Sequence, residues 1–345
     1  MNLTFLGGAN EIGGSSLILT INNKRFLIDA GIRMNERSGE DRVPDFSQIG
    51  KIDAIFLTHA HTDHSGALPI ANRYTQNAPI YMTYGTFQLC TVLFRDSLKL
   101  MQIVEKEIPR YDETEVINTF KNIKQVKFFH SIVLFDEIRV TFFPAGHILG
   151  ASCIYFESNS GNILFTGDYS IANQIAVSGA MVNASPDIVV TESTYGGKSH
   201  IPRKELEYQC ILKTKEVLER NGKILIPAFA IGRSQEMILL LKSAMSQKII
   251  PEVNVFIDGM VNSVNVVYEN NPSALPQNLQ AMIKNKQSLF YTGFIKRVLH
   301  SEREKLIKRD KPSIFISSSG MLIGGTSVFY AKELLGNTKN ALFIS

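Results

Sequence analysis

The sequence predicts an α/β protein in two parts: a sheet-on-sheet core covered by helices, then a domain in which helices and strands alternate. The first half of the chain has many short β-type runs that end at Gly, Asn, Asp or Pro. From about residue 203, long helical patterns alternate with short apolar runs. The length of 345 residues also fits about two domains of roughly 150 residues each.

The first half contains strand-like segments rich in Ile, Val, Phe and Leu. The predicted strands are residues 2–6, 15–21, 25–29, 54–58, 79–83, 126–130, 138–143, 152–157, 162–166 and 187–191. Helical periodicity predicts helices at 65–76, at 85–101 and near 112–122. Short strands in two groups with helices outside favour two stacked sheets.

The second half predicts an α/β alternation around a mostly parallel sheet. Its predicted helices are 203–220, 233–246, near 260–270, near 276–284 and 325–335, and its predicted strands are 223–227, 254–258 and 313–317. A linker-like segment at 196–200 places the boundary near 195–202, which gives domains 1–198 and 199–345. Residues 340–345 read as a strand that enters a core, whereas natural termini are usually polar. We therefore expect the chain to stop before its fold is complete.

The composition is that of a soluble globular protein. Apolar residues make up 44% and charged residues 20%, which argues against disorder. The 36 basic and 32 acidic residues give a net charge of +4, which permits an anionic partner without requiring one. Cys90, Cys153 and Cys210 lie far apart, which is typical of a reducing cytosol. No apolar run approaches the ~18 residues that span a bilayer, and no signal-peptide pattern is present, so a cytoplasmic protein with no membrane partner is expected.

The strongest chemical signal follows the apolar run Ala54–Leu57. His59, His61, Asp63 and His64 place three imidazoles and one carboxylate within six residues at the end of a predicted strand. Histidine is the commonest protein metal ligand. Side chains alternate in an extended segment, so His59 and His61 point to the same side, and the following turn brings Asp63 and His64 to a second position. This short segment can therefore serve two metal ions.

Three further residues fit the same pattern of a polar side chain just after a strand. His147 lies between two glycines after an apolar strand, and Asp168 follows another. Each alone would be an ordinary turn residue, but beside the histidine cluster both are interpreted as ligands. Asp29 follows the run Phe26–Ile28 and is interpreted as a partner that orients a ligand histidine or the catalytic water.

These residues, in this order, resemble the metallo-β-lactamase fold superfamily, whose αββα sandwich the resemblance predicts here. That fold is shared by lactamases and glyoxalases, so the motifs specify the scaffold and the metal site more than the substrate. The resemblance implies two Zn²⁺ ions, with Mn²⁺ as an alternative. One would be held by His59, His61 and His147. The other would be held by Asp63, His64 and Asp168, with Asp168 bridging.

The second half is similar to the β-CASP group of RNA- and DNA-processing nucleases, which includes the RNase J type and the cleavage and polyadenylation endonuclease subunit. The similarity rests on Thr191–Gly196, Ile226–Glu236, Ser317–Gly325 and the glycine-rich Gly7–Gly14. It covers essentially the whole chain and implies an inserted α/β domain. Glu192 would then be a catalytic acidic residue.

The sequence departs from that group at its end. The group has two more histidine motifs where the chain returns to the lactamase fold, but this sequence has no His after His300. We therefore expect the C-terminal return of the sandwich to be missing, the second metal to lack a ligand, and Glu192 to lack its histidine partner. A short homologue, a truncated gene and a trimmed chain are three explanations.

The predicted function is hydrolysis of phosphodiester bonds in single-stranded RNA by a hydroxide that two metal ions activate. Asp63 would orient this nucleophile or receive its proton, and Asp168 would bridge the metals. The preference for RNA over DNA comes only from the resemblance, and the residues leave DNA open. The resemblance leaves a homodimer open, since some members of the group pair, and an incomplete core would expose apolar surface that promotes association.

Four residues of the second half are candidate substrate contacts. Arg233 begins a predicted helix after a glycine and could contact phosphate, although a surface Arg at a domain interface is about as good a reading. Ser318, Ser319 and Gly320 lie at a strand-to-helix turn that could form a phosphate nest, or an ordinary Ser-rich turn. The basic run from Lys296 to Lys311 is interleaved with acidic residues and reads as a solvated helix.

Two other functions remain open at this stage. One is an RNA-binding relative with impaired catalysis, because the C-terminal histidine motifs are absent. The other is a metallohydrolase that acts on a small ester or thioester, against which the inserted α/β domain argues. RNA binding without cleavage would support the former, and ester turnover without RNA binding would support the latter.

Overall fold

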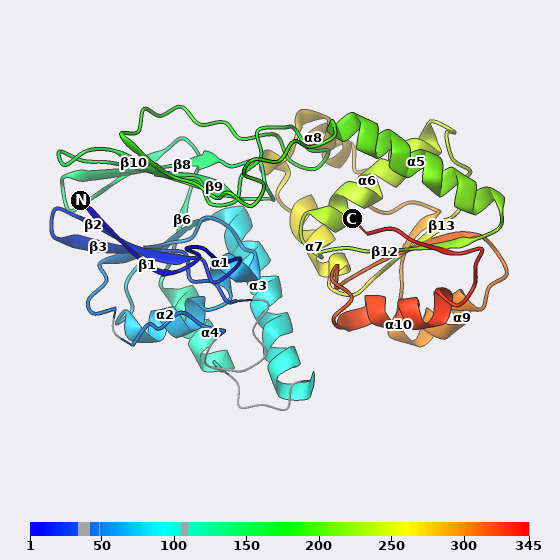
Figure 1. Cartoon of the computed structure of the whole chain (residues 1–345), viewed down its shortest axis with the longest axis horizontal. Coiled ribbons are helices and arrows are strands. Elements are labelled where there is room, and N and C mark those ends of the chain that lie inside the picture. The colour runs from blue at the N-terminus through cyan, green and yellow to red at the C-terminus, as the bar shows by residue number, and fades with distance from the viewer. Residues whose placement is uncertain (34–41, 48, 105–109, 345) are drawn as a thin grey trace. The chain divides into compact units, whose positions relative to one another are not determined.

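The computed structural model describes residues 1–33, 42–47, 49–104 and 110–344, which form two compact units (Figure 1). The first unit comprises Met1–Asn173 and Gly179–Thr194. The second comprises Gln174–Ser178 and Tyr195–Ser345. Each unit has its own sheets and its own hydrophobic core. Among the described residues, no helix combines the length and apolar character needed to cross a membrane.

The first unit contains two sheets, as the grouping of short strands predicts. The six-stranded sheet has the order β1-β2-β3-β4-β5-β6, with bounds Asn2–Gly7, Ser16–Ile21, Lys24–Ile28, Ala54–Phe56, Ile80–Thr83 and Ile123–Val126. The five-stranded sheet has the order β11-β10-β9-β8-β7, and from β7 to β11 the bounds are Ser131–Leu134, Ile138–Pro144, Ser152–Glu157, Ile163–Phe165 and Ile188–Val190.

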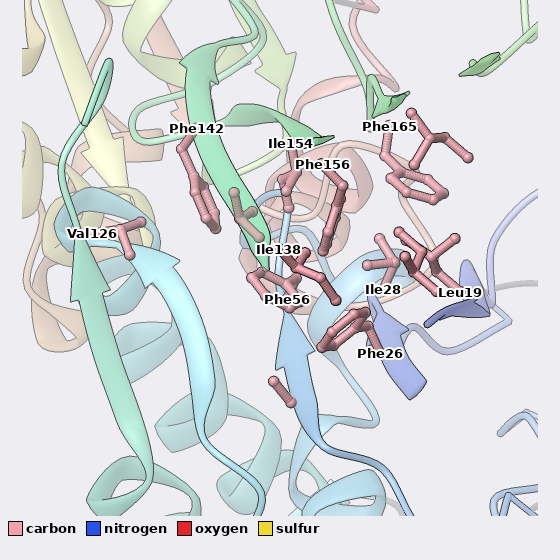
Figure 2. Close-up of a cluster of buried hydrophobic side chains, with 14 residues drawn as sticks. Leu19, Phe26, Ile28, Phe56, Val126, Ile138, Phe142, Ile154, Phe156 and Phe165 are labelled. Atoms are coloured by element: carbon pink, nitrogen blue, oxygen red, sulfur yellow. The ribbon is translucent and has the colours of Figure 1, made fainter. Parts of the chain in front are cut away.

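Phenylalanine rings join the two sheets (Figure 2). The ring of Phe56 on β4 lies 4.9 Å, centroid to centroid, from that of Phe156 on β9, and 6.2 Å from that of Phe142 on β8. All three side chains are fully buried. Burying one such side chain contributes about 1.5–3 kcal/mol. Because these contacts cross from one sheet to the other, the predicted sheet-on-sheet core is confirmed.

The described helices of the first unit are α1 (Thr62–Ser65), α2 (Leu68–Tyr74), α3 (Tyr84–Lys99) with a π-helical extension at Leu100–Val104, and α4 (Glu113–Lys121). Figure 1 shows α2, α3 and α4 on one side of the six-stranded sheet. The helix predicted at 65–76 is interrupted. Its Ala67 N–H donates to Ala30 O at 2.8 Å, and Asp63 O accepts instead from Ser15 N at 2.9 Å. The helical bond between residues 67 and 63 is therefore replaced by long-range bonds.

The strand predicted at 126–130 is wrong. The structure ends β6 at Val126 and begins β7 at Ser131, so residues 127–130 form the connection. The apolar pair Phe128–Phe129 produces a strand-like pattern, but Phe129 has a φ of 63°, a left-handed conformation that no strand residue adopts.

The second unit has a five-stranded sheet with the order β14-β13-β15-β12-β16, in which every pairing is parallel, as predicted. From β12 to β16 the bounds are Lys223–Pro227, Asn254–Asp258, Ile295–Arg297, Ser313–Ser317 and Ala341–Leu342. The described helices are α5 (Arg203–Glu219), α6 (Arg233–Ser246), α7 (Val261–Glu269), α8 (Gln277–Lys284), α9 (Arg303–Ile307) and α10 (Gly325–Leu334), with 3-10 turns at Pro272–Ala274 and His300–Glu302. Its core includes Phe256, Phe315 and Tyr330.

The basic run from Lys296 to Lys311, predicted as a helix, is only partly helical. Ile295–Arg297 forms edge strand β14, and Arg303–Ile307 forms a short helix. Three residues are too few to show a strand period in the sequence. The strand expected at the last residues is confirmed, since Leu342 of β16 pairs with Leu225 of β12.

A buried carboxylate ties the two chain segments of the second unit together. Glu236 of α6 is 4% exposed and accepts hydrogen bonds from Ile175 N at 2.8 Å and Ala176 N at 2.6 Å. The guanidinium of Arg203 also donates to it. An ion pair with two further donors offsets the cost of burying the charge. This explains why Gln174–Ser178 groups with the second unit rather than with its sequence neighbours.

Candidate metal centre

Histidines from two loops converge with one aspartate in the first unit. His59 and His61 follow β4, His147 follows β8, and Asp168 follows β10. One ligand atom from each of these four residues lies within 4.8 Å of the others. His59, Asp63 and His64 form a second such group. The structure thus brings all six predicted metal ligands into two groups that share His59.

Asp168 lies at the centre of this arrangement. Its Oδ1 is 3.2 Å from His64 Nε2, and its Oδ2 is 3.5 Å from His147 Nε2 and 3.8 Å from His59 Nε2. His147 Nε2 is also 3.0 Å from His61 Nδ1. The two oxygens of this carboxylate therefore face different histidines.

The charges of these groups depend strongly on one another. Burial lowers the pKa of His59 well below its usual value, and the neighbouring histidines add to this effect. Burial alone would also lower the pKa of His64, but the carboxylates of Asp29 and Asp168 outweigh it and raise that pKa well above the usual value. For Asp168, burial acts to raise the pKa, but the hydrogen bond and positive charge of His64 hold it well below its usual range.

The donor set fits a metal ion. His59 is fully buried, and its Nε2 has no hydrogen-bond partner within the described part of the chain. An unpaired buried nitrogen is costly, and native proteins rarely retain one without a reason. Three imidazole nitrogens and one carboxylate oxygen are donors that Zn²⁺ prefers. A metal bound there would satisfy the unpaired nitrogen.

Asp29 contacts the cluster through Thr58 and His64. It is 4% exposed, and its carboxylate accepts from Thr58 N at 2.8 Å and from Thr58 Oγ1 at 2.8 Å. Its Oδ2 also lies 2.7 Å from His64 Nδ1. This contact occupies Nδ1 and leaves Nε2 of His64 directed at Asp168, as the interpretation of Asp29 as an orienting partner requires.

Sequence reasoning missed two neighbours of the cluster. Thr58 Oγ1 lies 3.1 Å from His59 Nδ1, and Ser15 Oγ lies 3.4 Å from His64 Nε2. Thr58 could have been predicted as a neighbour, because it lies between a buried strand and the first histidine. Ser15 could not, because it only follows a glycine-rich segment and is 49 positions from His64 in the sequence.

The residue before His147, Gly146, lies too close to a neighbouring loop to carry a side chain. Its φ is 71°, and a Cβ there would lie 2.3 Å from Ser170 O and 2.4 Å from Ala180 N. Only a glycine lets the His147 loop pass this close to the loop that follows Asp168.

The remaining predicted site residues lie outside the two ligand groups. Glu192 is half-buried in the first unit and accepts a hydrogen bond from Thr194 N at 2.9 Å. Arg233 is the first residue of α6 and is exposed. Ser318, Ser319 and Gly320 follow β15. The last four belong to the second unit, which is compact on its own.

Comparison with protein families matches both units. A model described as a metallo-beta-lactamase superfamily domain matches residues 18–192, and a Beta-Casp domain model matches residues 234–345. One similar solved structure is a protein of unknown function from Enterococcus faecalis V583, with a TM-score of 0.56 and 15% sequence identity, which covers 92% of this chain and 77% of that one. At this identity it supports the fold alone.

Curated relatives include archaeal proteins named transcription termination factor FttA. Those of Methanosarcina mazei and Methanothermobacter thermautotrophicus are 33% and 34% identical to this chain, with 99% of this chain covered in each case. The protein of that name from Lokiarchaeum sp. is 32% identical over 100% of this chain. The chain spans only 55–56% of the length of these relatives.

Proposed function

The chain belongs to the metallo-β-lactamase superfamily and carries a β-CASP domain, and from this premise we propose that it is a zinc-dependent phosphodiester hydrolase of single-stranded RNA. The observation that carries the proposal is the buried His59 Nε2, which has no hydrogen-bond partner among the described residues and lies beside the converging side chains of His61, His147 and Asp168.

We assign the metal ligands from the sequence motifs, and the grouping of their side chains supports the assignment. His59, His61 and His147 would hold one ion, Asp63 and His64 would hold the other, and Asp168 would contribute to both. A divalent metal supplies Lewis acidity and can lower the pKa of a water molecule to about 7.

The protein groups have separate roles. Asp29 fixes the ring of His64, so its contribution is positional. Asp63 would orient the attacking water or accept its proton on a carboxylate oxygen. Glu192 would act on the side of the leaving oxygen, although the histidine that it would orient in the β-CASP group has no counterpart after His300 in this sequence. Arg233 and the Ser318–Gly320 turn would bind phosphate groups of the RNA.

The test is cleavage of end-labelled single-stranded RNA with Zn²⁺ or Mn²⁺, together with the zinc content of the dialysed protein. We expect metal-dependent cleavage that a chelator blocks, and loss of both cleavage and bound zinc in His59→Ala. His130→Ala is the matched control, because His130 is an exposed histidine outside both ligand groups. Unchanged turnover in His59→Ala would exclude this site.

The same assay separates the other candidate functions. RNA binding without cleavage would identify an RNA-binding relative with impaired catalysis. Turnover of a small ester without RNA binding would identify an esterase-type hydrolase. A matched DNA strand tests the preference for RNA.

A further inference from the structure

The turn between β12 and α6 presents two exposed side chains, Phe229 and Arg233. Its backbone is fixed by the residues that follow. Ser234 donates to Phe229 O from its N–H at 3.2 Å and from its hydroxyl at 2.8 Å. Gln235 is fully buried and accepts from Gly232 N at 2.7 Å. The turn is therefore rigid, and two of its side chains point outward.

The ring of Phe229 rests against the turn that follows β15. A Cβ on Gly320 would lie 2.8 Å from Phe229 N and 3.2 Å from its ring atom Cδ2. Glycine at 320 thus lets one part of the ring pack against backbone, while 46% of the residue stays exposed. A large aromatic side chain that is held against a rigid turn and is still half exposed offers a flat apolar surface that a ligand can cover.

Apolar side chains of the Ser317–Gly325 turn extend this surface. Met321 and Ile323, which follow Gly320, are 46% and 77% exposed. We call the three exposed side chains of Phe229, Met321 and Ile323 the Phe229 platform, since Gly320, directly before Met321, lies against Phe229. Arg233 lies four residues from Phe229 in the rigid turn, and within the described part of the chain no carboxylate pairs with its guanidinium.

We propose that the Phe229 platform stacks a nucleobase of single-stranded RNA while Arg233 contacts the adjoining phosphate. This inference rests on the proposed action on RNA and names the contact that would hold the substrate on the second unit. An exposed aromatic ring and an exposed guanidinium in the same turn suit a chain that alternates planar bases with negative phosphates. An acidic protein surface would use the arginine but would leave the ring uncovered.

The test measures binding, not cleavage. Metal-free protein in a chelator is titrated with a short single-stranded RNA that contains 2-aminopurine, whose fluorescence is quenched by stacking. We expect Phe229→Ala to weaken binding by about 5- to 140-fold and to abolish the quenching. Phe229→Leu should behave like the alanine variant, and Phe229→Trp should bind like the parent protein. Arg233→Gln should lower the slope of log affinity against log salt by about 0.7.

The controls separate stacking from packing. Phe294 is another exposed phenylalanine of the second unit, 39% exposed, and Phe294→Ala should leave both affinity and quenching unchanged. Thermal unfolding confirms that each variant is folded. Parent-like binding by Phe229→Leu, or an equal loss in Phe294→Ala, would overturn the platform. The binding test does not depend on the metal centre. If the protein never cleaves RNA, the loss of quenching in Phe229→Ala would still support the platform. If the protein cleaves RNA with metal but Phe229→Ala binds like the parent protein, only the platform would be rejected.

Discussion

At the scale of single residues, Asp29 connects the fold to the metal centre. It adopts a φ of 58° at the end of β3, where its carboxylate faces Thr58 and His64 instead of solvent. A buried carboxylate is stable there because two oxygens receive three contacts. The same contacts that stabilise the charge also set the direction of the His64 ring.

Replacing Asp29 by Ala should therefore affect stability and metal binding together. We expect a loss of about 3–5 kcal/mol in the free energy of unfolding, because His64 and the Thr58 N–H lose a buried partner. Zinc affinity should fall roughly 10- to 100-fold. Urea unfolding and competition with a chromophoric chelator measure the two effects.

Asp136→Ala is the matched control for the backbone. Asp136 also has a left-handed φ, 61°, but is exposed and belongs to neither ligand group. Asp136→Ala should lower the free energy of unfolding only by the strain of alanine at a positive φ, with no change in zinc affinity. Parent-like zinc affinity in Asp29→Ala would contradict the role assigned to Asp29.

At the scale of elements, the segment after β3 can pack against the backbone of α1 only because residue 31 is a glycine. A Cβ at this position would lie 1.6 Å from Asp63 O. The same stretch is bonded closely, with Gly31 N donating to Ser15 O at 3.0 Å and Ala30 N to His64 O at 2.7 Å. The backbone of Asp63 and His64 therefore packs directly against Gly31.

Gly31→Ala should displace the loop that carries Asp63 and His64. We expect a loss of more than about 4 kcal/mol, since neither backbone can give way. Gly293→Ala is the control, because a Cβ there meets nothing within 4 Å and should change stability by only about 0.5 kcal/mol. Thermal unfolding with zinc retention measures both, and an intact metal site in Gly31→Ala would contradict the predicted clash.

The elements also show what the sequence could predict. Helix 233–246 and strands 254–258 and 313–317 match the structure because each has a clear period and a Gly, Pro or Asp at its ends. The ligands His59 to His64 were visible because they are neighbours in sequence. Ser15, the break at Ala67 and strand β14 were not, because each depends on contacts between residues far apart in the chain.

At the scale of the whole molecule, two cores provide stability separately. The first unit is held by rings such as Phe56 and Phe156 between its sheets, and the second by Phe256, Phe315 and Tyr330 on its parallel sheet. A protein with two cores need not unfold in a single step.

Phe315→Ala should therefore destabilise the second unit alone. We expect a loss of about 3–5 kcal/mol there and no change in zinc affinity, since all six candidate ligands belong to the first unit. Hydrogen exchange read by mass spectrometry reports the two units separately. Phe142→Ala is the reciprocal variant, with faster exchange expected in the first unit. Equal acceleration in both units after Phe315→Ala would show that they unfold together.

The carboxylate of Glu236 has a consequence for how this protein could be divided genetically. A polypeptide that starts at Tyr195 includes Glu236 and Arg203 but not the Ile175 and Ala176 amides. Its buried charge would lose two donors, although no residue of the sheet or helices had been removed. The boundary in the sequence and the boundary in the fold therefore differ. A version of the second unit that keeps every donor to Glu236 has to include Gln174–Ser178, a five-residue segment that interrupts the sequence of the first unit near its end.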